Sequence, residues 1–172
     1  MDRVGRPIAE LPPSSTTALG DWYANVLFWR PQVALFVNAT TFVPVRIPLA
    51  PAAGMVARFP MAMAEVLGAL GVDQCFVETE MIEMSSFVVA KTASCQVLGA
   101  MNEFTFIAEH TICTGRSDPA DLIGLSVVLA WCKYRAGHRV VHLSDGQVMD
   151  SRPLVHWNRR TRDYQSRLHG VG

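Results

Sequence analysis

The segment from residue 86 to residue 112 has the strongest pattern of apolar and polar positions in the chain. It begins with the apolar run Phe87–Ala90, which is typical of a strand buried on both faces. Ser94 can then cap a helix near residues 96–112, because its hydroxyl can accept a hydrogen bond from a free N–H of the first turn. The apolar residues of this helix recur every three or four positions, which predicts a buried stripe with a polar face opposite. The stripe consists of Val97, Leu98, Met101, Phe104, Ala108 and Ile112, and the polar face of Asn102, Glu103, Glu109 and His110.

Two further apolar runs predict a β-hairpin. Val33–Val37 and Phe42–Ile47 flank a polar loop, a spacing typical of antiparallel strands joined by four residues. Pro44 and Pro48 lack the N–H that a sheet ladder needs, so the second of these strands is expected at a sheet edge. Another apolar run, Val26–Trp29, predicts a third strand. We therefore expect a small, mainly antiparallel sheet from residues 26–47 and 86–91.

Two segments predict helices on either side of Gly71. Near residues 60–70, Pro60 suits the first turn of a helix and Gly71 its C-terminal end. Near residues 74–84 the pattern is ambiguous: a strand would place Glu78 and Glu80 on one face, whereas a helix capped by Asp73 would place Glu80 and Glu83 together on the solvent side. The helix is the favoured interpretation. The residues expected to be buried are Met63, Val66, Leu67 and Leu70 in the first helix, and Val77, Met81 and Met84 in the second.

The last predicted helix covers residues 119–135. Asp118 can cap it, and Pro119 suits its first position. Apolar residues occupy nearly all sides between Leu122 and Trp131, which indicates a central helix. The pattern as a whole predicts an α+β fold, with one small sheet packed against about four helices. Its expected parts are a lead-in segment over residues 1–15, a globular domain over 16–136 and a basic hairpin and tail over 137–172.

Composition agrees with one globular domain, since half of the 172 residues are hydrophobic and 17% are charged. The net charge is zero, but residues 1–132 hold 7 Lys and Arg against 12 Asp and Glu, and residues 133–172 hold 8 against 3. A basic tail can bind an anionic ligand or nucleic acid, although a solvated or disordered tail is the favoured alternative. The residues that would make these contacts are Arg159, Arg160, Arg162 and Arg167, beside Trp157 and Tyr164.

Several classes of protein find no support in the sequence. No apolar run is as long as a membrane span, and the N-terminus has no signal-peptide pattern. The chain lacks nucleotide-binding glycine loops, nucleophile elbows and metal-ligand motifs, so we expect neither cofactor nor metal. The cysteines have no paired spacing and are expected to be buried free thiols in a reducing cytoplasm. They are Cys75, Cys95, Cys113 and Cys132.

Four boxes along the chain resemble a bacterial family known as domain of unknown function 6933. They are LGDWYANVLF (Leu19–Phe28), LFVNATTFVPV (Leu35–Val45), the Arg58–Gly71 helix and AKTASCQVLGAMNEF (Ala90–Phe104). The resemblance runs from about Thr16 to Ala130. It implies no established activity, and it is lost at both ends, where residues 1–13 and the segment after Trp131 differ from the family pattern. An absent first strand would leave a sheet edge open and would favour a homo-oligomer.

The polar and aromatic residues of these boxes are the candidate site. We expect the first box, before the Val26–Trp29 strand, to lie close to the second, with Lys91 bonded to Asp21 or Glu103 if the boxes brace each other. Two functions follow as hypotheses: a non-catalytic binding or interaction module, or a small hydrolase with two facing acids, such as a glycoside hydrolase. The candidate binding residues are Trp22, Tyr23, Asn25, Lys91, Thr92 and Asn102, and the candidate acids Asp21, Glu80, Glu83 and Glu103.

Overall fold

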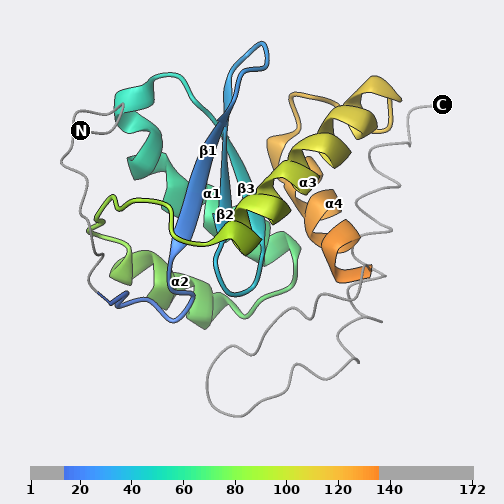
Figure 1. Cartoon of the computed structure of the whole chain (residues 1–172). Helices are drawn as coiled ribbons and strands as arrows, with labels where there is room; N and C mark the ends of the chain where they lie inside the picture. Colours follow the sequence, from blue (N-terminus) through green and yellow to red (C-terminus); the bar gives the residue numbers. More distant parts are fainter. Residues whose placement is uncertain (1–13, 136–172) are drawn as a thin grey trace.

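The structure is a computed structural model that describes residues 14–135. Within this range it has three strands and four α-helices, which confirms the predicted α+β fold of a single domain (Figure 1). The predicted basic hairpin and tail lie outside the described residues. In chain order the elements are β1 (Trp22–Leu27), β2 (Val33–Asn38), β3 (Pro44–Pro48), the short 3-10 helix η1 (Ala52–Gly54), α1 (Met55–Ala69), α2 (Gln74–Glu83), α3 (Cys95–Cys113) and α4 (Leu122–Arg135).

The sheet is fully antiparallel, with β2 between β1 and β3. Every residue of β2 is buried, since both faces of the sheet are covered. The predicted hairpin is confirmed as β2 and β3, and β3 is an edge strand, as Pro44 and Pro48 indicated. Side chains alternate across the sheet, so Val45 and Ile47 face one layer and Arg46 faces the other.

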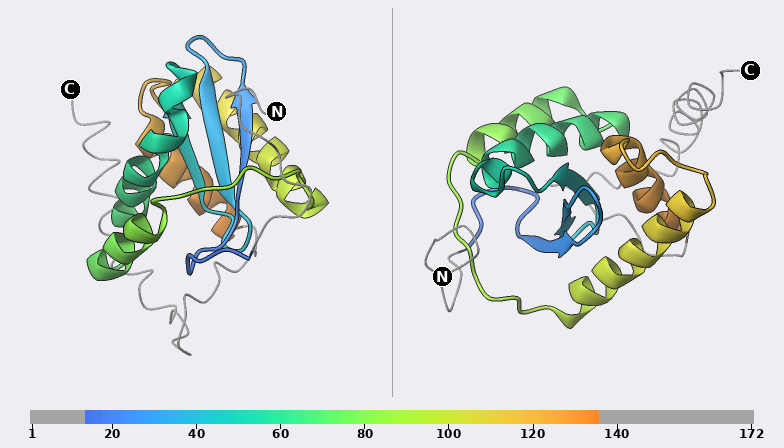
Figure 2. Two further views of the ribbon diagram at one scale, coloured as in Figure 1. Left: turned by 90° about the vertical axis from the view of Figure 1, so that its left-hand side faces the viewer. Right: turned by 90° about the horizontal axis from the view of Figure 1, so that it is seen from above.

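Helices cover both faces of this sheet and one of its edges (Figure 2). The α1 and α2 helices lie on one side and α3 on the opposite side, while α4 runs beside β3. Two cores result, one between the sheet and α1 and one between the sheet and α3. The α4 helix contributes Val127 and Ala130 to the first core and Leu125 and Leu129 to the second, as expected of a central helix.

The prediction of a strand over residues 86–91 is wrong. This segment carries only an isolated bridge at Ala90, and Phe87 and Val88 are 36% and 59% exposed. It belongs to the connection that leads from α2 on one side of the sheet to α3 on the other (Figure 2). Such a connection runs over the surface, in keeping with the exposure of Phe87 and Val88.

Two helix starts also differ from the prediction. The α1 helix begins at Met55, and Pro60 lies inside it. Arg58 stabilises this early start, because its guanidinium donates to the carbonyl oxygens of residues 48–51 and its Nε to that of Gly54. The α4 helix begins at Leu122 instead of residue 119. The reason is local: Asp118 Oδ1 accepts from Ala120 N–H in a turn, and Asp121 Oδ1 accepts from Gly124 N–H as the cap.

Other local predictions are confirmed. Asp73 caps α2 by accepting from the N–H groups of Cys75 and Phe76, so the helical interpretation of this segment is right. Ser94 caps α3 by accepting from Val97 N–H. Gly71 follows α1 with a φ of +82°, a left-handed conformation that glycine adopts without strain.

None of the four cysteines, all of them among residues 14–135, forms a disulfide, but three are exposed and Cys132 is half-buried, so the prediction of burial is wrong. Cys75, Cys95 and Cys113 lie at the ends of helices, where side chains are open to solvent. We expect Cys75, Cys95 and Cys113 to react quickly with a thiol reagent in the native protein and Cys132 to react more slowly. Titration after denaturation without reductant should find all four thiols, and a lower number would contradict the assignment.

Candidate functional site

The first box is part of the edge strand β1, and its aromatic residues point to opposite faces of the sheet. Trp22 meets Phe59 of α1 edge-on, with ring centroids 4.9 Å apart. Tyr23 packs in the core on the α3 side. Asp21 and Asn25 are exposed. These residues therefore do not line one common pocket, because alternation along a strand separates neighbours.

The second box supplies exposed polar groups and one ion pair. Lys91 and Thr92 lie in the surface connection before α3, and Asn102 lies on the exposed side of α3. Glu103 pairs with Lys133 of α4, so its carboxylate joins two helices. The second box contacts the first through the packing of α3, because α3 lies against β1 and β2.

Glu80 differs most from its predicted role. It was expected on a solvated helix face beside Glu83, but it is only 1% exposed, whereas Glu83 is exposed. Its carboxylate accepts from the N–H groups of Ala18 and Leu19, at 2.7 and 3.2 Å. Asn38 holds the same segment from the other side, because its Nδ2 donates to Leu19 O at 2.8 Å. Glu80 therefore fixes the segment before β1 onto α2.

Two of the candidate acids, Glu80 and Glu103, lie apart in the fold. Glu80 is on α2 and Glu103 on α3, which flank opposite faces of the sheet (Figure 2). Both carboxylates are engaged, one with backbone N–H groups and the other with a lysine. Among residues 14–135, no group of three or more His, Cys, Asp or Glu side chains is arranged to hold a metal ion.

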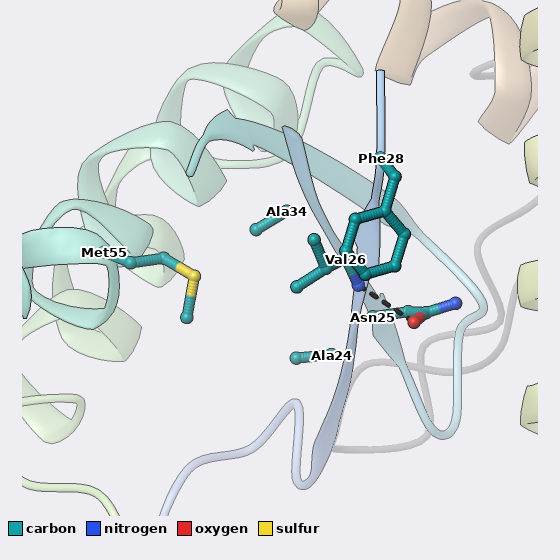
Figure 3. Close-up of a pocket in the computed structure, with 6 residues that line it drawn as sticks. All are labelled: Ala24, Asn25, Val26, Phe28, Ala34 and Met55. Atoms are coloured by element: carbon teal, nitrogen blue, oxygen red, sulfur yellow. Dashed lines mark hydrogen bonds between the residues drawn. The ribbon is translucent and has the colours of Figure 1, made fainter. Parts of the chain in front are cut away.

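An open hollow of about 240 Å³ lies beside β1 on the α1 side of the sheet. Figure 3 shows Val26, Phe28 and Met55 around it, with Asn25 at its rim. Ala24 and Ala34 complete the lining, so the side chains around the hollow are apolar except for that of Asn25. Asn25 Oδ1 accepts from Val26 N–H at 2.8 Å. The hollow suits contact with an apolar side chain and carries no titratable group.

The backbone of β1 provides hydrogen-bonding N–H and C=O groups beside this hollow. Asp21 O accepts from Ala39 N–H, at the β2 side of the strand. Because N–H and C=O groups alternate in direction along a strand, those of Ala24 and Val26 face the outer edge. Within the described part of the chain, β1 has a strand neighbour on one side only. The outward N–H of Val26 donates to the side chain of Asn25. The outward N–H and C=O groups of Ala24 belong to an exposed residue.

Arg46 is a candidate residue that the sequence interpretation missed. It lies in the middle of β3 and is 0% exposed, on the face opposite Val45 and Ile47. Its ring neighbour is Trp29, with the guanidinium carbon 5.1 Å from the ring centroid. The signal in the sequence was a charged residue between two apolar residues of a nearly continuous apolar run. Such a run is typical of a strand that is buried on both faces.

These features define a small α+β domain with an exposed edge strand, and the comparison with protein families places it. The profile described as Domain of unknown function (DUF6933) matches residues 1–138, so the chain belongs to this family. The match begins at residue 1, and the N-terminal segment expected to depart from the family therefore lies within it. Comparisons with curated proteins and with solved structures gave no match. None of the four helices is long and apolar enough to cross a membrane, as far as residues 14–135 are concerned.

Proposed function

We propose that this protein is a non-catalytic, cytoplasmic binding module that takes an extended segment of a partner protein along the edge of β1. The observation that carries the proposal is the combination of outward backbone groups at Ala24 with the apolar hollow beside them. A strand added to a sheet edge gains main-chain hydrogen bonds, and a neighbouring pocket reads its alternate side chains. Free thiols on the surface support the cytoplasmic location.

The size of the hollow supports a peptide rather than a small molecule. Sites for small ligands usually enclose about 300–1,000 Å³ and converge a few polar groups on the ligand. The hollow beside β1 holds about 240 Å³, is open, and offers one amide that is already bonded to the backbone. It therefore fits one apolar side chain of a partner, with Phe28 and Met55 as its walls.

The hydrolase alternative gains no support from Glu80 and Glu103, two of the four acids on which it was based. A glycoside hydrolase needs two carboxyl groups about 5–10 Å apart across a cleft. Glu80 and Glu103 lie on helices at opposite faces of the sheet, and each has a structural partner. The hollow itself contains no acid.

Selection from a library of random linear peptides tests the proposal. We expect the wild-type protein to enrich peptides with alternating apolar residues. Ala24→Pro should abolish their binding, because proline removes the outward N–H while the ladder to β2 is kept. Ala24→Thr is the matched control, since it retains the N–H and should retain binding. Val26→Lys should weaken binding by placing a charge in the hollow.

Two results would contradict the proposal. One is a selection that enriches no peptide over an unrelated protein of similar size. The other is a set of peptides that binds wild type, Ala24→Pro and Val26→Lys equally well, when circular dichroism shows that both variants are folded. A second copy of this chain is an alternative occupant of the edge. It would give concentration-dependent dimers that Ala24→Pro dissociates.

A further inference from the structure

The Arg46 guanidinium is fully buried without an acceptor. Its side chain is 0% exposed, and Nε, Nη1 and Nη2 have no hydrogen-bond partner among the described residues. The backbone is held firmly, because Arg46 N–H donates to Ser126 Oγ of α4 at 3.1 Å. A guanidinium carries five donors, and buried donors in proteins are nearly always paired. The arrangement is therefore that of a site prepared for an acceptor.

The same chain shows how it satisfies an arginine that has only a structural role. Arg58 donates through Nε, Nη1 and Nη2 to carbonyl oxygens of the turn before α1, at 2.9 to 3.4 Å. Arg46 has no comparable set of carbonyls around it in the described part of the chain. Arg58 is therefore a structural arginine, whereas the hydrogen-bond donors of Arg46 remain available.

The charge of Arg46 persists at neutral pH. Burial lowers the pKa of the Arg46 guanidinium to about 10, and the negative charge of Asp121 opposes that effect. A group with this pKa is almost entirely protonated at pH 7. Asp121 itself is committed to α4, where its Oδ1 accepts from Gly124 N–H at 2.7 Å. The buried positive charge of Arg46 is thus partly offset by the carboxylate of Asp121, which also caps α4.

Trp29 covers this charge and can uncover it. The indole ring stacks on the guanidinium, and its Nε1 donates to Glu109 Oε1 at 3.1 Å in a bond that is exposed to solvent. Trp29 lies just after β1, next to the exposed residues Arg30 and Pro31. This exposed hydrogen bond adds little to the hold on the ring, so moving the ring costs mainly its packing on the α3 side of the sheet and its contact with Arg46.

We propose that Arg46 forms a binding site for a small oxyanion, a free carboxylate or phosphate group that enters when Trp29 moves off the guanidinium. The planar fork of arginine matches two oxygens of either group with two parallel hydrogen bonds. The ligand is small because it replaces only the ring of Trp29.

Thermal unfolding with the anions themselves tests this site. Sodium phosphate, sodium acetate and sodium chloride are compared at one ionic strength and pH 7. At about a hundredfold excess over Kd, a specific ligand should raise the Tm of the wild-type protein by roughly 5–10 °C above chloride. The acetate and phosphate arms distinguish the two sources of the anion.

Three variants identify the residue responsible. Arg46→Met removes the charge at similar volume, so the protein should fold and lose the anion-dependent rise in Tm. Arg58→Met should lower Tm but keep that rise. Asp121→Asn retains a capping oxygen for α4 and removes a repelling charge, so it should bind the anion roughly two- to tenfold more tightly.

A measurement on the wild-type protein makes the test independent of variants. In protein labelled with ¹⁵N-arginine, a buried guanidinium gives Nε–H signals that exchange slowly with water, and those of Arg46 should shift on titration with the anion. The exposed Arg116 serves as an internal reference. The absence of both a shift and a rise in Tm above chloride would overturn the proposal, as would a rise that Arg46→Met retains in full.

Discussion

Glu80→Ala is expected to lower the free energy of unfolding by about 3–5 kcal/mol, because two hydrogen bonds to a charged acceptor are lost and each contributes roughly 1.5–3 kcal/mol. The carboxylate is buried, and the N–H groups of Ala18 and Leu19 would have no replacement from the protein. Urea unfolding followed by circular dichroism measures the change. Hydrogen exchange should accelerate at residues 18 and 19 in particular, since they lose their acceptor.

Glu83→Ala is the matched control for this prediction. It removes a carboxylate of the same helix, three positions further on, that is exposed to solvent. Surface substitutions of this kind usually change stability by less than about 0.5 kcal/mol. Glu80→Gln should lie between the two, because the amide oxygen can accept only one of the two bonds. Equal stability of Glu80→Ala and Glu83→Ala would refute the role assigned to Glu80.

Phe59→Ala is expected to cost about 3–5 kcal/mol, the usual loss when a buried phenylalanine leaves a cavity. Phe59 lies between two aromatic rings: it stacks on Phe36 of β2 with centroids 4.3 Å apart and meets Trp22 of β1 edge-on. Its removal would loosen the contact of α1 with both strands. Thermal or urea unfolding measures the loss, and near-ultraviolet circular dichroism should report the changed environment of Trp22.

Phe106→Ala provides the comparison for Phe59. Phe106 is on α3 and is 71% exposed, so its truncation removes almost no buried contact. We expect a change within about 0.5 kcal/mol. If both variants lost the same free energy, the core between the sheet and α1 would not depend on Phe59 in the way the ring contacts indicate.

Local patterns predicted most of the fold because each depends on near neighbours in the sequence. The hairpin of β2 and β3, the caps Asp73 and Ser94 and most of the stripe of α3 follow from spacing and side-chain chemistry. The exception in the stripe is Leu98, which was expected to be buried and is 43% exposed. The strand prediction for residues 86–91 was wrong, and the reason cannot be found in the local sequence. An apolar run forms a strand only where a partner strand continues beside it. Among residues 14–135 this segment carries a single bridge, at Ala90, and lies in the connection that passes from one side of the sheet to the other.

The site was less predictable than the fold, because its residues act through contacts distant in sequence. Glu80 carries the same local signal as Glu83, and only the segment at residues 18–19 distinguishes them. Trp22 and Tyr23 were grouped as neighbours, but the strand directs them to different faces. For Arg46, the sequence interpretation treated the strand only as a sheet edge. The correct inference from a charged residue inside an apolar strand was that its side chain is buried.

The position of α4 has a consequence for the order in which the chain matures during synthesis. Strands β1 to β3 and helices α1 to α3 precede Leu122 in the sequence, yet both cores are completed by residues of α4. A nascent chain that ends before Leu122 therefore presents apolar surface on both sides of its sheet. Such surface is what chaperones recognise and what drives aggregation of unfinished chains. We expect truncated forms without α4 to be held by chaperones as they leave the ribosome.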